Sequence, residues 1–200
     1  MSFLPSAATQ SPDISYATEV RRKLIHLCSL SLPAVIWYFP KITAVWILGA
    51  GFFGSLVVDF LRHYIPKDAG WWCHLAGLFR PREKGRLSGS SYILLSALLG
   101  TVFFQREVAT LSLVYVVVGD VAAALMGRRF GRHRLFDKSW EGSIAFFLAC
   151  FAFFPVVPGL TFLAKFLAAI LATILEVLPL KLDDNLTVPL GVGGFLALIS

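Results

Sequence analysis

Long apolar stretches separated by short polar segments run along most of the chain. A helix needs about 20 apolar residues, with a range of about 17–25, to cross the hydrocarbon core of a membrane. The apolar stretches cover about residues 24–39, 42–61, 90–104, 108–126, 144–157, 161–178 and 186–200. The last is short and contains Pro189 and three glycines, so we expect it to be tilted, broken or partly re-entrant. This pattern predicts an all-α, polytopic integral membrane bundle of about six to seven transmembrane segments.

The composition of the chain also indicates a membrane protein. Hydrophobic residues make up 57% of the sequence, and the mean hydropathy is +0.74. Charged residues make up only 15%, well below the ~25% of a soluble domain. A length of 200 residues suits one domain, which we place at residues 16–200. Residues 1–15 are polar and do not read as a cleavable signal, so we expect a flexible cytoplasmic tail followed by a retained first span.

The basic residues predict how the chain sits in the membrane. The net charge is +6, and 15 of the 18 lysines and arginines lie in connections on one side of the predicted spans. Because cytoplasmic loops carry such an excess, the N-terminus and the long loops should be cytoplasmic. We attribute the basic excess to topology and expect no nucleic-acid partner. The loop 62–88 contains Trp71 and Trp72, which predicts a short interfacial helix.

Ionisable residues gather at the predicted cytoplasmic ends of the spans, where they are costly and mark function by default. Glu19, Arg22, Lys23 and His26 have the spacing i, i+3, i+4 and i+7, so they share one face of a helix. Such a stripe can bind phosphate or position a carboxylate. A basic flank that only sets topology would explain Arg21, Arg22 and Lys23. It would not explain His26, which lies inside the apolar stretch.

A second polar stretch opens the third apolar segment at residues 82–92. Its serines, Ser88 to Ser91, can cap the following helix, and the free N–H groups of a helix start also attract anions. Asp59 lies near the inner end of the second apolar stretch. We expect it to pair with Arg62 or Arg86 and assign it no catalytic role.

The most informative stretch runs from Gly119 to Ser143. Asp120 lies about 9 Å inside the predicted span, where a carboxylate needs a partner, a metal or water. Small residues at 119 and 122–124 allow close helix packing. Gly127 and Gly131 bracket basic residues, and Lys138 follows. Magnesium-bound phosphates need this mixture of oxygen ligands and cations.

Carboxylates also cluster near the end of the chain. Glu176 lies just inside the sixth stretch, and Asp183, Asp184 and Asn185 follow in the next turn. Alone, Asp-Asp-Asn would be an ordinary turn. Together with Asp120 at the same depth, these side chains predict a Mg²⁺ site. The three scattered cysteines indicate neither a disulfide framework nor a zinc site, and the sequence has no GxxxxGK[ST] loop, HRD, DFG, GxSxG or HExxH motif.

In this order, the polar groups resemble motifs of the family of dolichol kinase, phytol kinase and CTP-dependent diacylglycerol kinase. Members share an ExxRKxxH-like entry, a Glu…Ser/Thr-Gly-Ala-like stretch, GDxxAxxxGRxFG, KSxEGS, and a late Glu followed by DDNxxxP. The matching segments here are 19–26, 83–90, 119–131, 138–143 and 176–189. Ser90 stands where Ala is common, and Trp140 where Leu is common. The resemblance covers about residues 16–200, and its third and fourth motifs together are specific.

The resemblance implies phosphoryl transfer from a nucleoside triphosphate, often CTP, to a prenol, dolichol, phytol or diacylglycerol hydroxyl, with Mg²⁺ as cofactor. Residues 16–200 would then be a catalytic domain facing the cytoplasm. Its expected metal ligands are Asp120, Glu176, Asp183 and Asp184. Its expected nucleotide- and phosphate-binding residues are Arg22, Lys23, Arg128, Gly131, Arg132, Ser139, Glu141 and Asn185. Its expected catalytic residues are Asp120, His26 and Lys138, with Asp120 or His26 orienting or deprotonating the alcohol.

Two other functions remain open at this point. The GDxxAxxxGRxFG and KSxEG pattern is also similar to part of phosphatidate cytidylyltransferase, which uses CTP and Mg²⁺ but transfers the cytidylyl group. A small transporter would also use intramembrane carboxylates, although its charges should lie near the midplane rather than on one side. Besides nucleotide, lipid alcohol and membrane lipids, a second copy of the chain is a possible partner, because the small residues between 49 and 54 suit a helix–helix interface.

Overall fold

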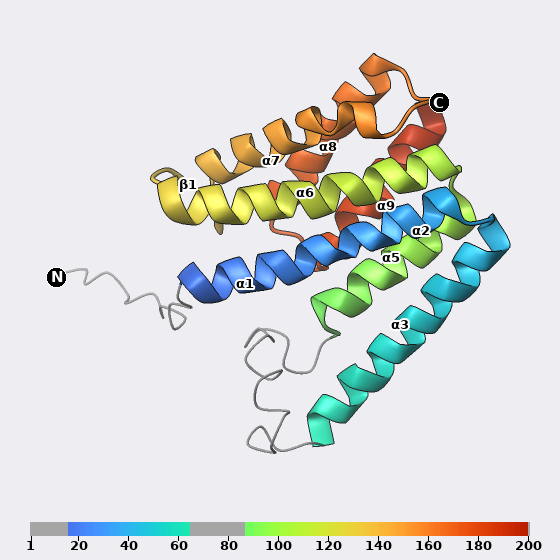
Figure 1. Ribbon diagram of the computed structural model, residues 1–200. Helices are drawn as coiled ribbons and strands as arrows, with labels where there is room; N and C mark the ends of the chain where they lie inside the picture. Colours follow the sequence, from blue (N-terminus) through green and yellow to red (C-terminus); the bar gives the residue numbers. More distant parts are fainter. Residues whose placement is uncertain (1–15, 65–86, 200) are drawn as a thin grey trace, which may run out of the picture.

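The computed structural model describes residues 16–64 and 87–199, which are almost entirely helical (Figure 1). The α-helices are α1 (Tyr16–Leu27), α2 (Ser31–Tyr38), α3 (Lys41–Tyr64), α5 (Gly89–Phe103), α6 (Arg106–Phe130), α7 (Trp140–Ala152), α8 (Phe162–Val177) and α9 (Asp184–Ile199). The 3-10 helices are η1 (Cys28–Leu30) and η3 (Phe154–Val156), and the strands are β1 (Arg134–Leu135) and β2 (Lys138–Ser139). The all-α prediction is confirmed. The predicted tail, the tryptophan-containing helix and Arg86 lie outside the described residues.

Each predicted apolar stretch contains at least one helix. The first consists of α1, η1 and α2, whose junction residues all keep right-handed helical dihedrals. Two helical segments are long and apolar enough to cross a membrane, Lys41–Arg62 and Arg106–Phe130, with mean hydropathies of 1.9 and 2.1. The apolar helices Gly89–Phe103, Trp140–Val156 and Asp184–Ile199 are shorter. These features support a membrane protein, while the number of six to seven spans stays a prediction.

Helix α6 is the centre of the bundle. It packs against α1, α2, α5, α7 and α9, and Figure 1 shows it between the α1–α2 pair and α7. Its first half is buried at every position from Val108 to Gly119, as expected for an apolar helix at the centre of a bundle. A Cβ on Gly119 would lie only 2.6 Å from the ring of Phe146. The missing side chain therefore lets α7 approach α6, as predicted from the small residues there.

A short hairpin links α6 to α7. Strands β1 and β2 pair antiparallel, with Leu135 opposite Lys138. Phe136 closes the turn with a φ of 54°, which is uncommon for a bulky residue. Ser139 then caps α7, because its Oγ accepts a hydrogen bond of 3.1 Å from the N–H of Gly142. The hairpin thus turns the chain back toward the bundle just before Lys138.

Asp59 anchors the start of α5 to α3. Its Oδ2 accepts hydrogen bonds from the N–H of Ser88 at 2.8 Å and from the hydroxyl of Ser91 at 2.6 Å. Its Oδ1 lies 3.4 Å from Arg62 Nε, which confirms that predicted pairing. Ser88 Oγ accepts from the N–H of Ser91 at 3.4 Å, so the predicted serine cap is confirmed. The carboxylate has a structural role at this junction.

Helix α3 is far less covered than α6. In the most apolar 18-residue part of each candidate span, 17% of the α3 residues are buried, against 67% of the α6 residues. The outer side of α3 includes Trp46 and Phe53, which are 75% and 69% exposed. Figure 1 shows α3 along one edge of the bundle. Such a large exposed apolar surface suits a helix that faces lipid.

Candidate functional site

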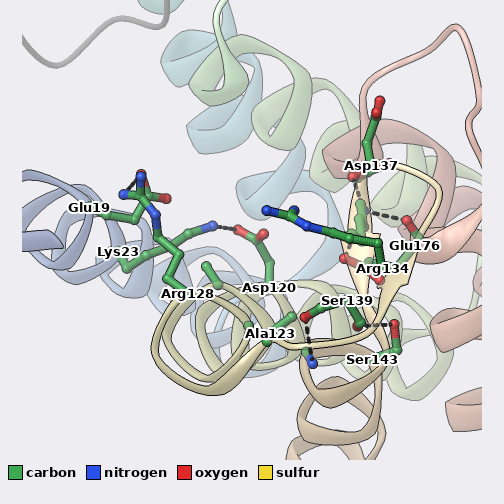
Figure 2. A pocket seen from close by; sticks show the side chains of 16 residues that line it. Glu19, Lys23, Asp120, Ala123, Arg128, Arg134, Asp137, Ser139, Ser143 and Glu176 are labelled. Carbon is green, nitrogen blue, oxygen red and sulfur yellow. Dashed lines mark hydrogen bonds and ion pairs between the residues drawn. The ribbon is translucent and has the colours of Figure 1, made fainter. Parts of the chain in front are cut away.

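The polar residues predicted to work together gather at one end of the bundle. The start of α1, the end of α6 and the hairpin meet there (Figure 1). They surround a cavity of about 480 Å³, here called cavity A, which α7, α8 and α9 also line. Figure 2 shows side chains from these elements pointing into the same space. Cavity A brings together eight predicted site residues: Lys23, Asp120, Arg128, Gly131, Lys138, Ser139, Glu176 and Asp184.

Asp120 meets the stripe on α1. Lys23 Nζ lies 2.5 Å from Asp120 Oδ2, and His26 Nε2 lies 3.3 Å from the same oxygen. Lys23 is 4% exposed. A buried ammonium group needs an opposite charge in contact with it, and the carboxylate of Asp120 supplies that charge. The spacing of Lys23 and His26 on α1 places both on the face toward α6. The sequence-based expectation that Asp120 needs a partner is thereby confirmed.

Lys138 joins two further carboxylates. Its Nζ lies 2.7 Å from Glu176 Oε1 and 2.8 Å from Asp184 Oδ2, and it also donates to the backbone carbonyl of Glu176. Burial disfavours the charged form of Lys138, but the carboxylates of Asp184 and Glu176 outweigh burial and raise its pKa. The side chain is therefore a fixed ammonium group at neutral pH. It ties the hairpin to α8 and α9.

Glu19 and Arg134 also line cavity A, although neither was among the expected metal-binding, phosphate-binding or catalytic residues, and Glu19 was predicted only as part of the polar stripe on the first helix. Glu19 Oε2 lies 3.3 Å from Arg22 Nη1 and 3.5 Å from Arg128 Nη1. Glu19 therefore connects α1 to the end of α6. Arg134 extends from β1 into the cavity toward Asp120 (Figure 2). The helical spacing was a usable signal for Glu19, whereas the position of Arg134 depends on the hairpin turn.

The glycines of the site allow the chain to fold tightly around the cavity. A Cβ on Gly131 would lie 2.2 Å from the carbonyl oxygen of Gly127 and 2.9 Å from Ser139 Oγ. A Cβ on Gly142 would lie 3.0 Å from the carbonyl oxygen of Ala123. Side chains at these positions would push the end of α6 away from the start of α7. The glycines thus bring the backbone, with its basic neighbours, to the edge of the cavity.

Arg132 and Glu141 do not line cavity A. Glu141 Oε1 accepts hydrogen bonds from the backbone N–H groups of Arg132 at 3.1 Å and His133 at 3.2 Å, and lies 2.9 Å from His133 Nδ1. Backbone hydrogen bonding, followed by the His133 side chain, lowers the pKa of Glu141 to about 2. The Arg132 side chain is exposed. In the structure, both residues stabilise the hairpin from outside the cavity.

The remaining predicted residues line an adjacent space of about 300 Å³, here called cavity B. Arg22, His26, Asp183 and Asn185 belong to it, and it shares Lys23, Asp120 and Asp184 with cavity A. Asp183 Oδ1 accepts a hydrogen bond of 3.0 Å from the N–H of Asn185, so it caps the start of α9. The Asn185 amide lies 3.4 Å from the carbonyl oxygen of Gly89. Cavity B therefore lies between α1, α5 and α9.

The carboxylates can be compared with the needs of a magnesium ion. Within residues 16–64 and 87–199, no three His, Cys, Asp or Glu side chains come close enough together to form a metal site of their own. Mg²⁺ is usually bound through one or two carboxylates plus substrate phosphates and water. Asp120, Glu176 and Asp184 line one cavity, and Glu176 Oε2 is buried without a hydrogen-bond partner in the described part of the chain. These residues fit a phosphate-bridged magnesium ion.

The chain is similar to several characterised proteins. It is 30% identical over 187 residues to the phytol kinase of Synechocystis sp. (strain ATCC 27184 / PCC 6803 / Kazusa), covering 86% of this chain and 76% of that protein. It is 28% identical over 204 residues to phytol kinase 1, chloroplastic, of Arabidopsis thaliana, covering 84% and 62%. It is 26% identical over 203 residues to CTP-dependent diacylglycerol kinase 1 of Saccharomyces cerevisiae, covering 86% and 70%.

The chain belongs to the family of phytol kinase, dolichol kinase and CTP-dependent diacylglycerol kinase. This confirms the resemblance found in the sequence motifs. No protein-family model and no solved structure matches the chain. The chain spans less than two thirds of the length of the Arabidopsis relative, 62%. The family members named here are kinases that act on different lipid alcohols, so membership alone leaves the acceptor open.

Proposed function

We propose that the protein is a CTP-dependent lipid alcohol kinase, which transfers the γ-phosphate of CTP to the hydroxyl of a polyprenol, phytol or diacylglycerol. The observation that carries this proposal is cavity A, where carboxylates and cations from α1, α6, the hairpin, α8 and α9 converge. A triphosphate needs this combination of charges, because phosphoryl transfer depends mainly on positioning and electrostatic stabilisation. The names of the relatives support the donor and the class of acceptor.

The cations of cavity A are placed to hold the phosphates. Lys23, Arg128, Arg134 and Lys138 all line the cavity. Arginine offers planar, bidentate contacts to phosphate, and lysine contributes a point charge. Lys23, Arg128 and Lys138 are paired with carboxylates in the structure. Phosphate oxygens can take over these pairings when the nucleotide binds, so the cations stay neutralised in both states.

The carboxylates of the same cavity would hold the magnesium ion. Asp120, Glu176 and Asp184 are the candidate ligands, with Asp183 beside them at the start of α9. The ion would neutralise charge on the triphosphate oxygens. Lys138 keeps Glu176 and Asp184 together in the structure. The two carboxylates are therefore already close together beside the phosphate-binding cations.

The transfer step follows from these positions. The hydroxyl oxygen of the lipid forms a bond to the γ-phosphorus, and the bond between that phosphorus and the β–γ bridging oxygen breaks. The products are CDP and a phosphorylated lipid. The hydroxyl proton passes to Asp120 or His26, which lie next to each other on facing helices, with 3.3 Å between Nε2 and Oδ2. Lys23, Arg134 and Lys138 stabilise the charge that develops on the transferred group and on CDP.

We propose that the site faces the cytoplasm. The described basic residues around cavity A belong to the connections that carry the excess of lysine and arginine, and such connections are usually cytoplasmic. CTP is available on that side of the membrane, while the lipid reaches the site laterally. The N-terminus would then be cytoplasmic as well.

The proposal is tested by comparing two substitutions on the same helix. Purified protein in nanodiscs would be incubated with Mg²⁺, γ-labelled CTP and a panel of phytol, farnesol, undecaprenol and diacylglycerol. Asp120→Asn should reduce transfer by at least about 100-fold, as expected for loss of a central electrostatic group. Glu107→Gln makes the same chemical change at the opposite end of α6 and should keep full activity. Full activity of folded Asp120→Asn would contradict the assigned role.

A further inference from the structure

Cavities A and B share two carboxylates and one lysine. Lys23, Asp120 and Asp184 line both, while the remaining walls of the two cavities differ. Of the two cavities, only cavity A is lined by Arg128, Arg134 and Lys138. Cavity B instead includes Ile25 on α1 and Ile93 on α5. A compartment suited to phosphates therefore adjoins a compartment with a partly apolar wall.

The apolar wall of cavity B continues onto the surface of α1. Ile25 is 54% exposed although it lines the cavity, so the apolar wall reaches the outer surface of the helix at this residue. Ile93 is 2% exposed and forms a fixed inner wall. A long apolar molecule can thus lie along α1 and place one end between Ile25 and Ile93. In a bilayer, such a molecule would reach the cavity from the side.

The polar wall of cavity B is held rigidly. Ser88 lines the cavity and is fixed by its hydrogen bonds to Asp59. A Cβ on Gly89 would lie 3.1 Å from the Asn185 amide nitrogen, which is a tight contact, so the glycine lets these two residues approach closely. The starts of α5 and α9 therefore define a narrow space beside Asp120. Rigid walls of this kind allow a cavity to select its ligand by shape.

We propose that cavity B is the acceptor site, which takes the hydroxyl end of the lipid alcohol, with Ile25 and Ile93 contacting its first carbon atoms. This inference rests on the proposed kinase function. In-line displacement requires the attacking and leaving oxygens on opposite sides of the phosphorus. A hydroxyl in cavity B and a triphosphate in cavity A approach the shared carboxylates, Asp120 and Asp184, from different sides. Ile25 is then a specificity-determining residue, because it narrows the entrance from the membrane.

Ile25→Trp tests the acceptor site, with Leu24→Trp as the matched control. Both positions are exposed on α1, and only Ile25 lines cavity B. Ile25→Trp should raise the KM for the lipid alcohol at least about 10-fold, the scale of discrimination by an apolar pocket wall. The KM for CTP should stay unchanged, and Leu24→Trp should behave like the unsubstituted protein. Equal lipid KM values for the two variants would overturn the proposal.

A second readout does not depend on catalysis. A long-chain primary alcohol with a diazirine near its hydroxyl end would be photo-crosslinked to the protein, and the modified peptides would be mapped. Crosslinks on α1 and α5 that disappear in Ile25→Trp and persist in Leu24→Trp support the acceptor site. Crosslinks elsewhere, or crosslinks unaffected by Ile25→Trp, overturn it. If the protein transfers no γ-phosphate at all, the kinase proposal fails, while the crosslinking still decides what cavity B binds.

Discussion

At the scale of residues, the site depends on buried charged groups that are each matched with an opposite charge. Glu176 is 4% exposed and contacts Lys138, and Lys23 is 4% exposed and contacts Asp120. Removing one member of a buried ion pair leaves an uncompensated charge, which is more costly than removing both. The same groups that would hold substrate therefore also stabilise the end of the bundle.

Lys138→Met should both inactivate and destabilise the protein. It leaves Glu176 without its cation, a loss of about 3–5 kcal/mol in comparable buried pairs. The double variant Lys138→Met/Glu176→Gln should recover much of the thermal stability without recovering activity. Thermal unfolding in detergent and γ-phosphate transfer would measure the two properties. An equally unstable double variant would show that the Lys138–Glu176 pair is not the cause.

Glu141→Gln should have a much smaller effect on activity than Asp120→Asn. Glu141 holds backbone N–H groups of the hairpin and does not line cavity A. Weakening such solvent-exposed hydrogen bonds has a modest effect on stability, so the hairpin should loosen without losing a substrate ligand. Initial rates at saturating CTP would measure this. A loss of activity as large as that of Asp120→Asn would place Glu141 in the reaction itself.

At the scale of elements, close packing of α6 and α7 positions Asp120. Gly119 precedes Asp120 and touches the ring of Phe146 on α7. The end of α6 then turns through Gly131 into the hairpin, which returns Lys138 to the cavity. Helix packing and the hairpin therefore fix the two main charged groups of the site relative to each other.

Gly119→Ala should destabilise the bundle. The added Cβ would lie 2.6 Å from Phe146, and overpacking of this kind typically costs about 1–3 kcal/mol. Gly49→Ala on α3 is the control, because nothing in the described structure lies within 4 Å of a Cβ there. Thermal unfolding would compare the two. Equal stability of both variants would contradict the close α6–α7 contact.

The sequence predicted the elements better than it predicted their contacts. Apolar length placed a helix at 42–61, and the structure has α3 at Lys41–Tyr64. Helical spacing also placed Lys23 and His26 on one face, and both meet Asp120. The roles of loop residues were harder to predict, because Arg134 reaches the cavity only through a turn with a φ of 54° at Phe136. A local sequence pattern does not predict such a long-range contact.

At the scale of the whole molecule, the candidate site lies at one end of the bundle, and a large apolar surface lies on α3. Cavities A and B lie at the same end of the bundle, where α1 starts and α6 ends. The apolar outer surface of α3 suits lipid. In the proposed function, a soluble nucleotide and a membrane alcohol would meet at this end without either crossing the membrane.

Cysteine labelling would test the orientation. In a variant without the native cysteines, His133→Cys marks the hairpin and Val156→Cys marks the opposite end of α7. Both positions are exposed. In intact cells, a membrane-impermeant maleimide should label Val156→Cys but not His133→Cys, which should react after permeabilisation. The reverse result would contradict a cytoplasmic site.

The most direct test of the central claim follows the phosphorus atoms of CTP. Purified protein in nanodiscs would be incubated with Mg²⁺ and CTP labelled at either the α- or the γ-phosphate, with a panel of lipid alcohols and phosphatidate. We predict that label from the γ position enters a lipid alcohol, that CDP is released, and that label from the α position stays in the nucleotide. Transfer of α-label to phosphatidate, with release of pyrophosphate, would contradict the kinase and establish a cytidylyltransferase in the same cavity.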